Sequence, residues 1–371
     1  MKLVVSLILV MVFVSCQKEK NNTASTDGST AFYVGTYTDG ESEGIYKYKL
    51  LKDGQLERVG LVAKTVNPSY LTKSDDGKYL LAVNEVNNND GSGFIESFKI
   101  TKDSLILIDK ASSGGAYPCY LTTNSNNYIL AANYTGGNLG LLQLNSKGEL
   151  SDLLDVEQHE GNGATERQKG PHVHAAKLGS DNTIISADLG TNELWFSKID
   201  TLTNQFQPLS QDRLEMEIGA GPRHFVIHPN GMWVYVINEL NSTITLVNKT
   251  TSGTYQVEAS ISTLPTDFEG ANSCADIHIS WGGKFVYASN RGHDSIAIFK
   301  VNQQDGTLSF MGTEPTRGKS PRNFSLSPDE NFVIVANQNT DNIISFKRDQ
   351  GTGMLSFVDE IKAPKPVCIL F

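Results

Sequence analysis

The chain has 371 residues and a formal net charge of −10, from 31 Lys and Arg against 41 Asp and Glu. Because a surface that binds nucleic acid needs a basic patch, this acidic balance argues against nucleic acid as a partner. Glycine is abundant, with 33 residues, and turn pairs such as Asp76-Gly77 and Asn230-Gly231 stand between apolar runs. These pairs are typical of β-hairpins, and no long helical period accompanies them.

The first residues differ from the rest of the chain. An apolar run, residues 3–14, is too short to span a bilayer as a mature helix, and Cys16 and a polar stretch follow it. This order resembles a bacterial lipoprotein signal, which is cleaved before a Cys that becomes acylated. We therefore expect residues 1–15 to be the signal peptide, Cys16 to carry the lipid and residues 16–30 to be a flexible tether.

This signal predicts where the protein resides. A lipoprotein is held in the cell envelope, facing the periplasm or the cell surface, and it contacts the membrane only through its lipid anchor. The alternative is an ordinary secretory signal with a Cys there by chance. If the signal interpretation is wrong, the protein is cytoplasmic.

One pattern is repeated six times along the rest of the chain. Each copy has a Pro or its substitute, an alternating apolar run, a turn, and a second apolar run that ends in Asn or Asp. The copies begin at Pro68, Pro118, Pro171, Pro222, Ala275 and Pro321, at intervals of 50, 53, 51, 53 and 46 residues. A period in this range, made of short strands, predicts the blades of a β-propeller.

Two segments remain outside the six copies. Residues 31–50 resemble the second and third strands of a repeat, and residues 365–371 resemble a first strand. Together they complete one more blade, so we predict an all-β fold, a seven-bladed β-propeller over residues 31–371. Strands from the two ends of the chain then close the ring, which removes the open sheet edges.

Because the copies share one pattern, residues that differ between equivalent positions of the copies can be identified. In each blade the first strand lines the central channel and the second strand returns, so the start of one and the end of the other lie on the same face. The first ring predicted at this face is Ser69, Cys119, His172, Arg223, Asp276 and Arg322. The second ring is Glu85, Tyr134, Leu189, Glu239, Arg291 and Gln338. Burying charge is costly unless it is paired, so these charged side chains need a reason beyond the fold.

Arginine, histidine and carboxylate side chains in such a ring suit a small, anionic, oxygen-rich molecule. Arginine binds carboxylate or phosphate with two donors, and His and Glu can transfer protons. We assign catalysis to His172, His174, Arg223, Glu239 and Arg291. We assign substrate binding to Arg167, Gln168, His224, Asp276, His293, Arg322 and Glu85. For His224 a structural role is as well supported, and Asp276 could serve only to balance an arginine.

No metal or other cofactor is expected. His172 and His174 lie on one face of a strand, but no third metal ligand is evident. Outside the signal, the chain has three cysteines, Cys119, Cys274 and Cys368. Because two of them fall on inner strands of different repeats, we predict no disulfide.

Several runs resemble the seven-bladed lactonase family, which includes the propeller type of bacterial 6-phosphogluconolactonase and the fungal carboxy-cis,cis-muconate cyclase. The resemblance covers nearly all of the chain after residue 30, through YVGTYT at Tyr33, NPSYL at Asn67, RQKGPHVH at Arg167, GPRHFVIHPNG at Gly221, NEL at Asn238, SNRGHDSIAIF at Ser289 and PVCILF at Pro366. In the cyclase a His, two Arg and a Glu are proposed to form the site. By motif these are Arg223, Arg291, Glu239 and one of His172 and His174.

The resemblance implies hydrolysis of a sugar lactone, such as 6-phospho-D-glucono-1,5-lactone to 6-phosphogluconate in the pentose phosphate pathway. His172, His174 or Glu239 would act as the base, and without a Ser nucleophile elbow we expect no acyl-enzyme. A muconate-type lactonizing reaction is the first alternative. The second is a non-catalytic envelope propeller that binds a sugar acid or a protein partner. A phosphorylated lactone is a cytoplasmic metabolite, so the export signal leaves the exact lactone open.

Overall fold

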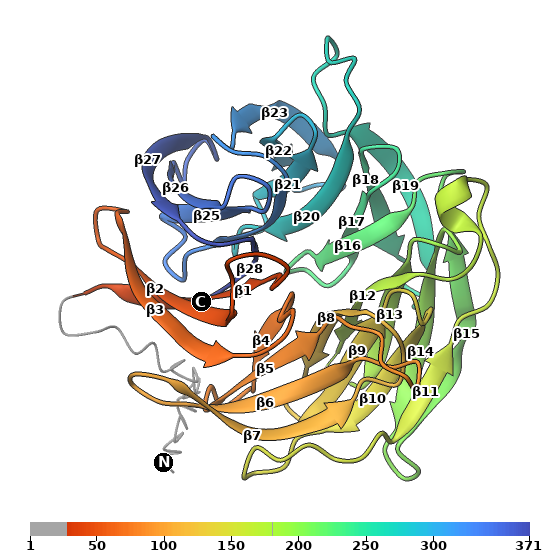
Figure 1. The fold of residues 1–371 in the computed structure, drawn as a ribbon. Helices are drawn as coiled ribbons and strands as arrows, with labels where there is room; N and C mark the ends of the chain where they lie inside the picture. Colours follow the sequence, from red (N-terminus) through yellow and green to blue (C-terminus); the bar gives the residue numbers. More distant parts are fainter. Residues whose placement is uncertain (1–27, 180) are drawn as a thin grey trace, which may run out of the picture.

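The computed structural model describes residues 28–179 and 181–371. In this part of the chain, 28 strands form seven four-stranded sheets around a central axis (Figure 1). The prediction of an all-β, seven-bladed propeller is confirmed. The predicted signal peptide, Cys16 and residues 17–27 of the predicted tether lie outside the described residues. No helix within the described ranges has both the length and the apolar character needed to cross a membrane.

Each sheet is one blade, and its strands follow one another from the channel to the rim. The blade that both chain ends share consists of β28 (Pro366–Leu370), β1 (Thr30–Thr36), β2 (Gly44–Leu50) and β3 (Leu56–Lys64). The next two consist of β4 (Leu71–Lys73), β5 (Tyr79–Asn84), β6 (Phe94–Ile100) and β7 (Leu105–Ser112), and of β8 (Pro118–Thr123), β9 (Tyr128–Asn133), β10 (Asn138–Gln143) and β11 (Asp155–Gln158).

The remaining four blades have the same order. The fourth and fifth consist of β12 (Val173–Leu178), β13 (Thr183–Asp188), β14 (Glu193–Asp200) and β15 (Gln205–Glu215), and of β16 (Pro222–Ile227), β17 (Trp233–Asn238), β18 (Thr243–Lys249) and β19 (Tyr255–Ser262). The last two consist of β20 (Ser273–Ile279), β21 (Phe285–Arg291), β22 (Ser295–Val301) and β23 (Leu308–Pro315), and of β24 (Pro321–Leu326), β25 (Phe332–Asn337), β26 (Asn342–Arg348) and β27 (Leu355–Lys362). A short 3-10 helix, η1 (Glu166–Gln168), lies on the loop between β11 and β12.

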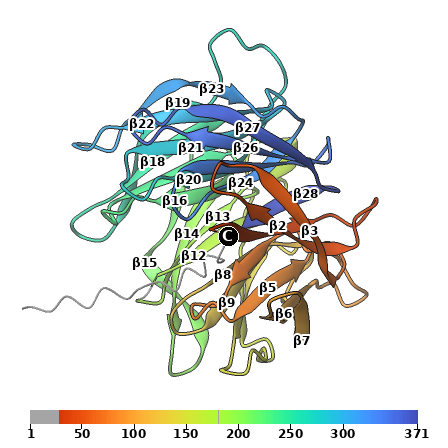
Figure 2. The same cartoon turned by 90° about the vertical axis from the view of Figure 1, so that its left-hand side faces the viewer.

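The ring closes through strand pairing between the two ends of the chain, as the split repeat predicted. Strand β28 pairs antiparallel with β1, with Val34 opposite Ile369 and Gly35 opposite Cys368. In the side view β28 lies beside β24 of the neighbouring blade (Figure 2). The last strand in the sequence therefore becomes the innermost strand of the first blade.

Neighbouring blades are joined by buried side chains and by a tyrosine hydrogen bond that recurs around the ring. Tyr235 of β17 donates to the carbonyl of Gly306 at 2.7 Å, and Tyr287 of β21 donates to the carbonyl of Gly353 at 2.8 Å. In each case the acceptor lies in the outer hairpin of the following blade. A buried tyrosine needs such a partner for its hydroxyl, so these contacts fix each blade against the next one. The result is a rigid frame around the channel.

Candidate active site

A bulge near the start of the inner strand places one side chain of each of several blades at the same mouth of the channel. Strand pairing skips Cys119, His174, Arg223 and Arg322, each of which lies between two paired residues. A bulge leaves the extra residue unpaired and turns its side chain away from the regular alternation. These four residues are therefore structural equivalents, one from each of four blades.

This equivalence corrects one part of the predicted first ring. The counterpart of Arg223 in the fourth blade is His174, two residues beyond the predicted His172. The repeat was aligned on Pro171, but the residue that occupies the place of Pro222 is Val173. In the sixth blade the irregularity spans two residues, Ala275 and Asp276.

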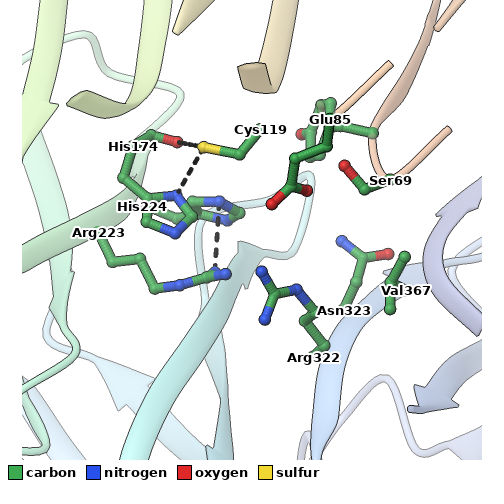
Figure 3. A pocket seen from close by; sticks show the side chains of 10 residues that line it. Ser69, Glu85, Cys119, His174, Arg223, His224, Arg322, Asn323 and Val367 are labelled. Carbon is green, nitrogen blue, oxygen red and sulfur yellow. Dashed lines mark hydrogen bonds between the residues drawn. The ribbon is translucent and has the colours of Figure 1, made fainter. Parts of the chain in front are cut away.

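The bulged side chains surround a hollow of about 270 Å³, a volume that includes its opening to solvent (Figure 3). Its lining consists of Ser69, Tyr70, Glu85, Cys119, His174, Arg223, His224, Arg322, Asn323 and Val367. Figure 3 shows Arg223 and the ring of His174 on one side of this space, with the carboxylate of Glu85 and Arg322 across from them. Five predicted site residues therefore meet here, although they come from four blades.

Glu239 lies beside the hollow and binds three arginines. Its Oε2 accepts from Arg223 Nε at 2.9 Å and lies 2.9 Å from Arg291 Nη2, and its Oε1 accepts from Arg167 Nη2 at 3.0 Å. Burial alone would raise the pKa of the Glu239 carboxyl, but the three guanidinium charges outweigh it and hold that pKa at about 2. Glu239 therefore remains ionised and orients the arginines. Its pKa makes it a poor proton acceptor.

Arg291 stands behind Glu239 and does not line the hollow. Its Nη2 also donates to the carbonyl of Cys274 at 2.8 Å, and its buried Nε has no hydrogen-bond partner within the described residues. Burial lowers the pKa of Arg291 to about 10, and Glu239 partly offsets this effect. The guanidinium thus stays charged near neutral pH, and its Nε donor is not used by any described residue.

His224 and Asp276 form a chain behind Arg223. A guanidinium can only donate, so Arg223 Nη1 donates to His224 Nε2 at 3.3 Å, and His224 Nδ1 then donates to Asp276 Oδ1 at 2.8 Å. Burial and the charge of Arg223 lower the pKa of His224 to about 4. The other oxygen of Asp276 accepts from Asn323 Nδ2 at 2.6 Å and contacts His278 Nε2 at 3.1 Å. His224 is therefore neutral, and the chain fixes the position of Arg223.

His174 is buried and has one ring nitrogen in contact with a cysteine. Its Nδ1 lies 3.6 Å from Cys119 Sγ, which also lies 3.7 Å from the carbonyl of His174 (Figure 3). Burial and the charge of Arg223 lower the pKa of His174 well below its ordinary value. Burial also raises the pKa of the Cys119 thiol. Both groups are therefore neutral in the resting protein, and all three cysteines of the described part are free and buried.

A second set of interacting side chains lies on the other side of the hollow and consists of Tyr37, Glu85 and Arg322. The Tyr37 hydroxyl donates to Glu85 Oε2 at 2.8 Å, and the Arg322 guanidinium lies over the Tyr37 ring, 5.3 Å from its centroid. Arg322 has this ring contact but no hydrogen bond or ion pair with any residue that the structure describes. Its N–H groups are therefore available to a bound molecule.

Three predicted site residues are placed away from the hollow. The buried side chain of Gln168 donates to the carbonyl of Leu189 and to Asn192, which fixes the loop between blades. His172 stacks on the ring of Tyr134, with centroids 4.5 Å apart, and donates to its carbonyl. His293 bonds Ser295 and packs against Phe268. Arg167, by contrast, reaches Glu239 from the exposed rim.

Sequence reasoning missed Tyr37, although the repeat contained the signal. Tyr37 follows β1 as Glu85 follows β5 and Glu239 follows β17. It therefore holds the same place in the split blade that these residues hold in theirs. The second ring was drawn from the six complete copies only, and extending it to the split copy identifies Tyr37.

The charges around the hollow are unequal in number. Four guanidinium groups, those of Arg167, Arg223, Arg291 and Arg322, lie in and around the hollow with three carboxylates, those of Glu85, Glu239 and Asp276. The excess of positive charge suits an anionic ligand, which would meet donors that the protein leaves unused. Among the residues that the structure describes, no three His, Cys, Asp or Glu side chains gather as metal ligands.

The fold and this site define a seven-bladed β-propeller with a charged small-molecule hollow at one mouth of its channel. The model of the family described as lactonase, 7-bladed beta-propeller, matches residues 31–371. The chain therefore belongs to this lactonase family.

Two named relatives and a solved structure are similar to this chain over most of their length. The chain is 34% identical over 308 residues to a Bacillus subtilis 6-phosphogluconolactonase, covering 80% of this chain and 84% of that protein. It is 34% identical over 309 residues to a Formosa agariphila 6-phosphogluconolactonase, covering 80% and 86%. Among solved structures, the Pseudomonas aeruginosa periplasmic gluconolactonase is similar, with a TM-score of 0.87 and 28% identity, covering 92% of this chain and 98% of that chain.

Proposed function

We propose that the protein hydrolyses an anionic sugar lactone, with 6-phospho-D-glucono-1,5-lactone as the first candidate substrate. The observation that carries this proposal is the hollow, in which guanidinium groups outnumber carboxylates and the Arg322 guanidinium has no acceptor among the described residues. The names of the Bacillus and Formosa relatives support a phosphorylated lactone, and the Pseudomonas neighbour supports a gluconolactone.

The residues of the hollow have different roles in lactone opening. Water attacks the ring carbonyl, and the negative charge that develops on the carbonyl oxygen lies near Arg223, with Arg291 and Glu239 behind it. Fixed cationic donors at such an oxygen stabilise the transition state without reorganising. The free N–H groups of Arg322 bind the anionic substituent of the substrate.

The sequence suggested His172, His174 or Glu239 as the base, and these three residues lie in different places relative to the hollow. Glu239 is bound by three arginines, and His172 donates to a carbonyl away from the hollow. Only His174 lines the hollow, where Glu85 is a further group able to take a proton. Proton transfer therefore belongs to His174 or Glu85.

The test is a panel of lactones assayed for ring opening above the spontaneous rate. The purified protein should open 6-phosphogluconolactone or glucono-1,5-lactone, and it should leave a carboxymuconate unchanged. Lactonization of the muconate would replace this proposal with the cyclase reaction. Absence of any turnover, together with measurable binding of a sugar acid, would instead show a non-catalytic binding protein.

We also propose that the chain is an exported lipoprotein that is acylated at Cys16 after removal of residues 1–15. The order of the N-terminal residues supports this location, and the Pseudomonas neighbour is described as a periplasmic protein. Cells expressing the full chain would be labelled with a fatty-acid precursor and fractionated. Label in the envelope fraction, lost in Cys16→Ala, is the expected result, and an unlabelled cytoplasmic protein would contradict it.

A further inference from the structure

We infer that Glu85 is the group that takes the proton from the attacking water, with Tyr37 holding its carboxylate in position. This inference rests on the proposed lactone hydrolysis and assigns one step of it. It begins from the two carboxylates nearest the hollow, Glu85 and Glu239, which have different surroundings.

The two oxygens of Glu239 are both engaged by arginines, whereas Glu85 has one free oxygen. Glu85 Oε2 accepts from the Tyr37 hydroxyl at 2.8 Å, and Oε1 receives no hydrogen bond from any residue that the structure describes. Figure 3 shows the carboxylate of Glu85 directed into the hollow, across from His174 and Arg223. A base must reach the water that it activates, and Glu85 satisfies this condition while Glu239 does not.

His174 also lines the hollow, but its surroundings oppose a positive charge. It is buried and close to Arg223, and both conditions favour the neutral ring. Protonation of His174 would add another cation to the guanidinium cluster. Protonation of Glu85 would instead remove a negative charge as another one forms on the lactone oxygen. His174 then serves as a neutral ring beside the reacting carbonyl, with Nδ1 held by Cys119.

The step balances without an additional reactant. Glu85 Oε1 accepts a proton from water as the water oxygen forms a bond to the carbonyl carbon, and the π electron pair moves to the carbonyl oxygen beside Arg223. When that oxygen re-forms the double bond, the bond from carbon to ring oxygen breaks. The ring oxygen keeps the electron pair and receives the proton back from Glu85. The product is the open hydroxy acid, and the carboxylate is ready for the next turnover.

The experiment compares Glu85→Gln with the wild type and with Glu41→Gln, a change at an exposed carboxylate on the loop that follows β1. We expect Glu85→Gln to lower kcat by about 100-fold or more, since general base catalysis contributes on the order of 10²–10⁴, with little change in KM. Added formate should restore part of the activity of Glu85→Ala. Thermal melts should match, and Glu41→Gln should behave as the wild type.

Tyr37→Phe gives an independent readout that does not depend on the Glu85 variants folding. Loss of the hydroxyl removes the hydrogen bond that positions the Glu85 carboxylate, so kcat should fall while KM changes little. Unchanged kcat in Glu85→Gln, or a much larger loss of kcat in His174→Gln than in Glu85→Gln, would overturn the inference while lactone hydrolysis stands. A wild-type protein that opens no lactone would overturn both.

Discussion

Glu239 Oε2 accepts a hydrogen bond from Arg223 Nε at 2.9 Å, and both side chains are buried. The two residues lie on neighbouring strands of the fifth blade, one in the bulge of β16 and the other directly after β17. Arg291 and Arg167 bind the same carboxylate from the sixth blade and from the loop before the fourth blade. One carboxylate therefore holds three cations from different parts of the ring around a single opening.

Replacement of this carboxylate should destabilise the fold. Glu239→Gln leaves the Arg223 and Arg291 guanidiniums buried without their counter-charge, and breaking a buried ion pair from one side costs about 3 to 5 kcal/mol. Urea unfolding should show a loss of this size in the free energy of unfolding. Glu41→Gln, at an exposed carboxylate, should leave it unchanged. A loss below about 1 kcal/mol in Glu239→Gln would show that the arginines do not depend on Glu239.

Stability should fall as the pH is lowered from about 6.5 to 4. The folded protein keeps His224 neutral, with a pKa of about 4 against an ordinary value of 6.5, so below pH 6.5 the unfolded chain binds a proton that the folded chain does not. His224 should account for a loss of about 3 kcal/mol over this range. Unfolding measured at fixed ionic strength tests this, and His224→Gln should show a shallower dependence. An equally steep dependence in that variant would contradict the assignment.

Much of this account follows from the sequence, and its failures have physical causes. The six copies and the split copy predicted the ring, because strand period and turn residues repeat in the sequence. Arg223 and Glu239 stood out because some copies have uncharged residues, such as Ser69 and Leu189, at the matching places. His172 was misplaced because a bulge shifts which residue faces the channel, and residue spacing does not show a bulge. Gln168 was misjudged because its loop folds inward onto Asn192.

Removal of the last strand should open the ring. Without residues 364–371, β1 loses its inner partner β28, and the edge of β1 becomes exposed. The truncated chain should melt at a lower temperature, over a broader range, and it should associate with itself in size-exclusion chromatography. A shorter truncation that removes only Phe371 leaves β28 whole and serves as the control. A truncated protein without residues 364–371 that melts as sharply and at the same temperature as the full chain would refute ring closure by β28.

Arg322 should decide how strongly the protein prefers a phosphorylated substrate. Its guanidinium has a ring contact with Tyr37 but no carboxylate partner in the described part of the chain, so Arg322→Gln removes free donors while leaving Glu85 bound to Tyr37. A hydrogen bond to a charged group contributes about 1.5 to 3 kcal/mol, which predicts a rise in KM for 6-phosphogluconolactone of about 10- to 100-fold. The KM for glucono-1,5-lactone should change much less. Equal changes for both lactones would place the anionic substituent elsewhere.

The most direct test of lactone hydrolysis at this hollow is the initial rate of 6-phosphogluconolactone opening by the wild type and by Arg223→Lys. Lysine keeps the positive charge beside Glu239 but loses the planar, two-point donor geometry of the guanidinium. The account predicts opening well above the spontaneous rate in the wild type. It also predicts a kcat about 100-fold lower in the variant, with both proteins folded, because a fixed oxyanion donor is lost. Equal rates in the two proteins, or a wild-type rate no faster than spontaneous opening, would contradict it.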